Sequence, residues 1–160
     1  MSRFLSLWAA LARLAVTASL CVPLLAPAAA RAQDFSALAR VLPAESHVTD
    51  HGRDGIALQL EMSQGVPYRL FTLDDPARFV LDFQEVDWTG LDADTFVATE
   101  RVVQAKFGTY VPGWTRMVLQ LSGPMQVAQA AMQIDEVTAA ARLNLTLQPI
   151  DPERFAATAG

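Results

Sequence analysis

The residues of this sequence best suited to chemistry are charged and aromatic side chains on the outward faces of predicted strands. Arg78 and Asp82 lie four residues apart on one such face. Trp114 and Arg116 share an outward face further along the chain, and Lys106 would lie near them if the two strands pair. A tryptophan beside cations can stack on a sugar ring while the cations bind acetamido or carboxylate groups. The same residues are also typical of a cross-strand ion pair and an edge tryptophan that covers the core, so both interpretations stay open.

Catalytic and metal-binding patterns are absent from the sequence. Its two histidines are His47 and His51, and a helical zinc site with this spacing needs a glutamate after the first histidine, where Val48 stands. The sequence contains no G-x-S-x-G nucleophile motif and no glycine-rich phosphate loop. Asp74 and Asp75 precede a proline, which is typical of a turn rather than an acid-base pair. We therefore expect exposed loop histidines, no catalytic residue, no metal and no cofactor.

Alternating apolar and polar residues predict the strands that carry these side chains. In residues 78–83, phenylalanine and leucine alternate with outward residues, as in a half-buried strand. The pattern recurs, because residues 119–121 repeat the sequence LQL of residues 58–60, and residues 142–147 can be laid over residues 78–83. In the predicted strand at residues 102–110, Val103 is expected to point inward. The sequence therefore predicts one β unit that occurs twice.

The repetition predicts two units, at residues 45–84 and 100–148, joined by an acidic linker at residues 85–99. Each strand has one apolar face to bury, so we expect an all-β sandwich of two similar four-stranded antiparallel sheets packed face to face. The linker is expected to contain a helical turn and to place Trp88 and Phe96 against the sandwich edge. Much of the predicted core consists of Phe71, Phe79, Leu81, Phe83, Phe107, Leu119, Leu145 and Leu147.

The two ends of the chain are predicted to lie outside the sandwich. Residues 1–32 have the pattern of a cleavable secretory signal, with arginines near the start, an apolar run and an A-x-A site at Ala30 to Ala32. An uncleaved N-terminal anchor is the alternative, and a lipid anchor at Cys21 is disfavoured because a leucine precedes it. Residues 33–44 are expected to form a leader or a short helix, and residues 149–160 a C-terminal tail.

Charge and cysteine content limit the partners and the compartment. The sequence has 12 basic and 17 acidic residues; without residues 1–32, which contain three arginines, the balance is 9 minus 17, or −8. Such acidity disfavours nucleic acid as a partner. The one cysteine, Cys21, lies in the predicted signal, so the mature chain would have no disulfide and no thiol chemistry. This is typical of a bacterial periplasmic protein without stable membrane insertion after signal cleavage.

Two motifs stand out in the predicted strands: DPARFVLD at residues 75–82, and KFG at residues 106–108 followed by WTRMVLQLSGP at residues 114–124. They resemble the AMIN domain, the N-terminal non-catalytic module of periplasmic N-acetylmuramoyl-L-alanine amidases that also occurs in secretins and other envelope proteins. The first is similar to the family's D-P-x-R-hydrophobic-x-hydrophobic-D strand, and the second to its F-G and T-R-hydrophobic-V-hydrophobic-x-L segments. The resemblance covers roughly residues 46–148.

The resemblance implies two symmetric four-stranded sheets and binding to peptidoglycan, which would target an attached enzyme to the wall or septum. The residues that we expect to bind peptidoglycan are the outward-facing Arg78, Asp82, Lys106, Trp114 and Arg116. We expect a non-catalytic periplasmic module that localises a cell-wall amidase or an envelope complex. The alternative is a protein-interaction module that docks onto a secretin or divisome assembly through an exposed sheet edge.

Two departures from the family pattern limit what the resemblance implies. The amidase domain that normally follows is absent from this sequence, since no histidine follows Asp151 and Glu153 stands alone. Either the module is free-standing or the sequence is the front of a longer amidase, and amidase activity of this chain itself is disfavoured. The second unit has Arg142 and Thr146 where the first has an Arg and Asp pair, so equal binding by both faces is not expected.

Overall fold

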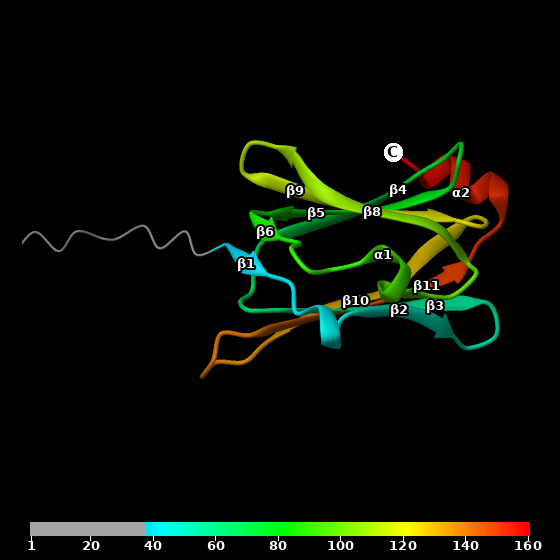
Figure 1. The fold of residues 1–160 in the computed structure, drawn as a ribbon. Helices are drawn as coiled ribbons and strands as arrows, with labels where there is room; N and C mark the ends of the chain where they lie inside the picture. The colour runs from blue at the N-terminus through cyan, green and yellow to red at the C-terminus, as the bar shows by residue number, and fades with distance from the viewer. Residues whose placement is uncertain (1–37) are drawn as a thin grey trace, which may run out of the picture. The chain divides into compact units, whose positions relative to one another are not determined.

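The computed structural model describes residues 38–160. The predicted signal, residues 1–32, and the first part of the predicted leader lie outside the described residues. Most of the described chain is β-strand, arranged in two facing sheets (Figure 1). None of the helices within residues 38–160 has the length and apolar character that crossing a membrane requires.

A five-stranded sheet forms one layer of the sandwich. Its strand order is β10-β11-β3-β2-β7, and all neighbours are antiparallel except β2 and β7, which are parallel. Its strands are β2 (His47–His51), β3 (Gly55–Met62), β7 (Val97–Ala98), β10 (Met125–Ile134) and β11 (Ala141–Pro149). Because β7 has only two residues, this layer is a four-stranded antiparallel sheet with a short parallel addition.

A four-stranded antiparallel sheet forms the other layer, in the order β4-β5-β9-β8. Its strands are β4 (Tyr68–Leu73), β5 (Arg78–Gln84), β8 (Val102–Val111) and β9 (Trp114–Leu121). The predicted all-β sandwich is confirmed. Each sheet joins a pair of strands from the first half of the chain to a pair from the second half (Figure 1). The repeated sequence pattern therefore corresponds to a repeated topology.

Apolar side chains from the inner faces of both sheets form the core. Leu81 lies opposite Met117 across β5 and β9, and Leu58 lies opposite Leu145 across β3 and β11. All four side chains are buried, and each such residue contributes about 1.5–3 kcal/mol to folding. The predicted core residues that belong to this core or pack against it are Phe79, Leu81, Phe83, Phe107, Leu119, Leu145 and Leu147.

Phe71 is the predicted core residue that lies elsewhere. It is opposite Val80 on β5, whereas its neighbour Leu70 is opposite Leu81 and points into the core. Because successive side chains of a strand point to opposite faces, the register of β4 places Phe71 on the outer face of its sheet. The prediction that Phe71 is a core residue is therefore wrong.

A β-bulge in β8 shows that the prediction of an inward-pointing Val103 is wrong. The register of β8 against β9 shifts between Val102 and Gln104, which leaves Val103 as the extra residue. Val103 is 61% exposed, and Val102 is buried in its place. An alternating pattern read from the sequence cannot show where such an extra residue interrupts the alternation.

The predicted linker packs into the sandwich. It contains β6 (Val86–Asp87) and the short helix α1 (Ala93–Phe96), close to the helical turn expected from the sequence. Trp88 and Phe96 are buried within the core, and the Trp88 ring stacks on Phe107 with 5.5 Å between ring centroids. This segment therefore fills space between the sheets as well as joining the two halves of the chain.

The described part of the predicted leader is extended. β1 (Ala39–Arg40) pairs in parallel with β6, and a 3-10 turn, η1 (Pro43–Glu45), follows it. Ala39 and Val41 are buried in the core. Pairing with β6 and burial of these side chains hold the backbone extended, so the short helix that is one expectation for residues 33–44 does not form at residues 38–42.

The C-terminal segment forms helix α2 (Pro152–Thr158) rather than the expected tail. Asp151 caps its first turn through its carboxylate, which accepts backbone N–H groups. Phe155 is buried, and the N–H of Gly160 donates to the Thr72 carbonyl of β4 at 3.0 Å. The one buried aromatic residue explains why this short polar segment is ordered against the sandwich.

Candidate functional site

Strand register brings the five predicted binding residues onto the outer face of the four-stranded sheet. Asp82 of β5 lies opposite Arg116 of β9 on one side and Arg69 of β4 on the other. Arg116 lies opposite Gly108 of β8, so this row crosses all four strands. By the same alternation, this face also carries Arg78, Lys106 and Trp114.

Asp82 is the buried centre of this row. Its side chain is 0% exposed, yet it bonds to two arginines. Arg116 donates from Nε to Oδ1 at 2.5 Å and from Nη2 to Oδ2 at 2.9 Å, and Arg69 Nε donates to Oδ2 at 2.8 Å. The hydrogen bond from Arg116 lowers the pKa of Asp82, burial opposes this, and Arg69 lowers the pKa further. The carboxylate is therefore ionised and positions the two arginines, and it is not itself open to a ligand.

Aromatic rings flank both arginines. The Cζ atom of Arg116 lies 3.5 Å from the centroid of the Tyr110 ring and 5.5 Å from that of Phe71. The Cζ atom of Arg69 lies 5.0 Å from the Trp114 ring. These distances fit cation–π contacts. Trp114 thus stacks on Arg69 rather than on the Arg116 of its own strand.

Arg78 and Lys106 extend the positive charge along the same face. Arg78 donates from Nε to the Pro76 carbonyl at 3.1 Å and from Nη2 to the Asp74 carbonyl at 3.3 Å, so it closes the turn before β5 instead of pairing with Asp82. Lys106 is exposed and lies opposite Val118. A pocket of about 270 Å³ lies between the two cations, lined by Pro76, Arg78, Gln104, Lys106, Val118 and Gln120.

The outward strand residues of this sheet have a net positive charge. We call this surface the cationic face and define it by Arg69, Phe71, Arg78, Asp82, Lys106, Tyr110, Trp114 and Arg116. Four cations minus one carboxylate give +3, whereas the whole sequence has a net charge of −5. A local positive field of this kind attracts anionic groups to one side of an acidic protein.

Sequence reasoning missed three members of the cationic face: Arg69, Phe71 and Tyr110. Arg69 and Phe71 lie on β4, whose YRLFTL sequence has no clear polar and apolar alternation. Tyr110 lies beside the β-hairpin turn, where the register against β9 shifts between Thr109 and Val111. Arg69 can be assigned to the face only from the register, which places it opposite Asp82.

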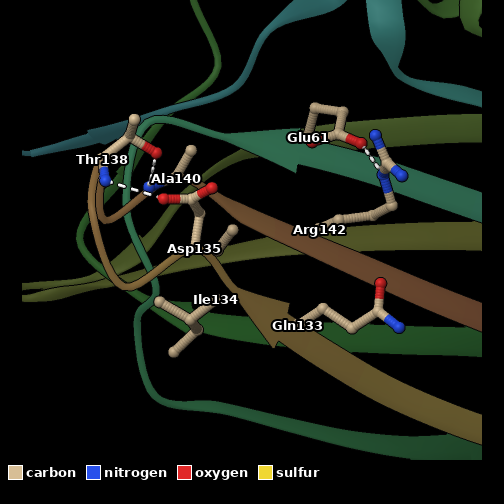
Figure 2. A pocket seen from close by; sticks show the side chains of 8 residues that line it. Glu61, Gln133, Ile134, Asp135, Thr138, Ala140 and Arg142 are labelled. Carbon is tan, nitrogen blue, oxygen red and sulfur yellow. Dashed lines mark hydrogen bonds and ion pairs between the residues drawn. The ribbon is translucent and has the colours of Figure 1, made fainter.

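The outer face of the opposite sheet has different chemistry (Figure 2). Arg142 of β11 donates from Nε to the carboxylate of Glu61 on β3, which is buried, and this hydrogen bond raises the pKa of Arg142. A pocket of about 360 Å³ lies beside the pair, and Asp135 at its rim accepts the N–H of Thr138 at 2.8 Å. Outward positions near the pair carry amides and a hydroxyl: Gln59, Gln133, Asn144 and Thr146. The ionisable residues that line this pocket are one cation and two acids, which sum to −1, in contrast to the +3 of the cationic face.

The histidines do not form a metal site with other described residues. His47 and His51 are both exposed, as expected, but they lie at the two ends of strand β2 rather than in a loop. Within residues 38–160, no three side chains of His, Cys, Asp or Glu lie close enough together to hold a metal ion.

Comparison with known proteins identifies the family. The family model described as the AMIN domain matches residues 47–147, which run from the start of β2 into β11 and include the whole cationic face. No curated protein matches the sequence. The matched region covers more than half of the chain, so the protein belongs to the AMIN-domain family.

Proposed function

We propose that this chain is a non-catalytic peptidoglycan-binding module of the periplasm, which localises a cell-wall amidase or an envelope complex through its cationic face. AMIN domains are peptidoglycan-binding and targeting modules of periplasmic proteins. The observation that carries the proposal is the pair Arg69 and Arg116, which a fully buried Asp82 fixes at the surface. Septal localisation of the attached enzyme or complex would follow from binding to the wall there.

The arrangement favours ligand binding over a purely structural role for these residues. Arg69 has a side chain that is 57% exposed although it bonds to a carboxylate with no exposure. A guanidinium that is already held in place loses little conformational freedom when a ligand binds to it. The acidic chain also gathers four cations on this one face, which increases the local concentration of anionic partners.

Co-sedimentation with purified peptidoglycan sacculi tests the proposal. The wild-type chain should sediment with sacculi, and the double variant Arg69→Gln/Lys106→Gln should stay largely in solution. The matched control is Arg53→Gln/Arg154→Gln, which removes the same charge at exposed positions in the turn after β2 and in α2. Wild-type chain that sediments no better than an unrelated protein of similar charge would overturn the proposal.

A sheet edge favours a second candidate function, docking onto a secretin or divisome assembly. Within the described chain, β10 pairs only with β11 and offers ten residues of open edge, with Ile134 56% exposed at its end. An open edge of this length can accept a strand from a partner protein. Binding to an envelope fraction that persists after muramidase digestion would support this function instead of wall binding.

The proposal also holds that this chain does not cleave peptidoglycan. Zinc-dependent amide hydrolysis needs a cluster of metal ligands, and within residues 38–160 no three side chains of His, Cys, Asp or Glu lie close enough together to form one. Incubation of the pure chain with sacculi should release no stem peptides, and their release would contradict this part of the proposal.

A further inference from the structure

We infer that the cationic face recognises the carboxylate groups of the wall's stem peptides and not the neutral glycan. This inference rests on the proposed function and assigns the chemical group that the site binds. It depends on three observations: the free donors of Arg69, the covered faces of the aromatic rings, and the spacing of the cations across the sheet.

Arg69 has hydrogen-bond donors left over after it binds Asp82. A guanidinium carries five N–H donors in a planar fork, and Arg69 uses Nε for the Asp82 carboxylate at 2.8 Å. Within residues 38–160 its Nη1 and Nη2 atoms make no hydrogen bond, and the side chain is 57% exposed. These two nitrogens present a fork that matches both oxygens of a carboxylate.

The aromatic residues of the face are arranged to hold cations. One side of the Trp114 ring is covered by Arg69 at 5.0 Å, and one side of Tyr110 is covered by Arg116 at 3.5 Å. A sugar that stacks on either ring from that side would have to displace a guanidinium that is also bonded to Asp82. The rings therefore stiffen the arginines, which favours an anion over a sugar as the ligand.

The cations are spaced for more than one carboxylate. Arg69 lies on β4 and Lys106 on β8, at opposite edges of the sheet. Neighbouring strands are about 4.8 Å apart, so three such spacings separate these two strands by about 14 Å. An extended peptide spans about 3.3–3.6 Å per residue, so about four residues would bridge them. A short peptide with several carboxylates fits this spacing better than a single small ion.

Chemically modified sacculi test the inference by co-sedimentation. One sample has its carboxylates converted to amides with a carbodiimide and ammonia, and a second has its amines acetylated, which keeps the carboxylates. We expect wild-type binding to fall at least about tenfold on amidated sacculi, the effect of losing one charged hydrogen bond, and to persist on acetylated sacculi. On untreated sacculi, Arg69→Gln and Lys106→Gln should each weaken binding, and Arg53→Gln should not.

Each outcome separates the inference from the proposed function. Equal binding to untreated and amidated sacculi would overturn the inference and leave wall binding intact, whereas no binding to untreated sacculi would overturn the proposed function. If amidation abolishes binding but the Arg69 and Lys106 variants bind like the wild type, the carboxylates are recognised elsewhere and the assignment to this face is wrong. Lys106→Gln keeps the test valid even if Arg69→Gln disturbs folding, because the Lys106 side chain is exposed and makes no hydrogen bond or ion pair with another residue in the described part of the chain.

Discussion

Asp82 and Arg116 lie directly opposite each other on β5 and β9, joined by two hydrogen bonds of 2.5 and 2.9 Å. The carboxylate is fully buried, whereas the arginine side chain is 23% exposed. The pair therefore joins β5 to β9 on the outer face of the sheet, with the carboxylate covered and the guanidinium partly exposed at the surface that we propose for binding. Arg69 bonds to the same carboxylate from β4, so three strands are tied together at one point.

Replacing this carboxylate should destabilise the fold in a pH-dependent way. Asp82→Asn keeps the side-chain shape but leaves two arginines without a counter-charge, and we expect a loss of about 2 kcal/mol in unfolding free energy at pH 7. Because the folded-state pKa of Asp82 is lowered, its stabilisation is fully present above the unfolded pKa of about 3.9 and is lost as the pH falls through the folded pKa.

Urea denaturation of both proteins from pH 7 to pH 3 checks this prediction. The difference between wild type and Asp82→Asn should stay constant down to about pH 5 and shrink below about pH 4. Asp50, Asp87 and Asp135 also have lowered pKa values and titrate in both proteins, so the difference isolates Asp82. A difference that grows on acidification would show that Asp82 is not an ionised partner of the arginines.

Trp114 is predicted to matter for binding more than for stability. Trp114→Ala removes the ring beside Arg69, and an exposed cation–π contact is worth about 0.5–1 kcal/mol. We expect the affinity for sacculi to fall about two- to fivefold, measured by co-sedimentation over a range of protein concentrations. Trp114→Phe keeps an aromatic face and should retain most of the binding. Equal weakening by both substitutions would argue against a ring that positions Arg69.

The sequence predicts the sandwich well because the inward residues of the central strands are mostly large and apolar. In β5 and β9 the residues at 79, 81, 117 and 119 are buried as expected, and the outward Val80 and Asp82 are buried as well. The alternation fails where register decides the outcome: the mixed polarity of β4 does not show that Phe71 faces outward, and the bulge at Val103 has no local signal. The helix α2 has only one buried large residue, which is too little for a periodic pattern.

The candidate site, like the fold, could be predicted only in part from the sequence. Motifs in β5, β8 and β9 contain all five predicted binding residues, and the strand pairings place them on one face. Arg69 belongs to no motif, and its role follows only from its position opposite Asp82. The sequence likewise suggests that Arg78 shares a face with Asp82, but it does not show that Arg78 is held by the carbonyls of the preceding turn.

The core prediction can be tested at one leucine, Leu81, and one valine, Val103. Leu81 is fully buried, so Leu81→Ala should cost about 2–5 kcal/mol of unfolding free energy. Val103 is 61% exposed at the bulge, so Val103→Ala should change the unfolding free energy by less than about 0.5 kcal/mol. Chemical denaturation measures both. A large loss for Val103→Ala would place that side chain in the core and contradict the bulge.

Helix α2 should contribute to stability although it lies outside the two sheets. Phe155 is 1% exposed, and Phe155→Ala should cost about 3–5 kcal/mol. Arg154→Ala, at the exposed neighbouring position, is the control and should have little effect. Thermal and urea denaturation compare the two variants. If Phe155→Ala unfolds like the wild type, the helix does not pack on the sandwich in solution.

Binding through the cationic face can be mapped by nuclear magnetic resonance of the isotopically labelled chain, titrated with a soluble muropeptide that retains its stem peptide. We expect the largest shift changes at the Arg69 and Arg116 Nε–H groups, the Trp114 indole N–H and the Lys106 backbone N–H, all residues of the cationic face. Changes confined to Gln59, Asn144 and Arg142 on the opposite sheet, or to the β10 edge, would contradict binding through the cationic face.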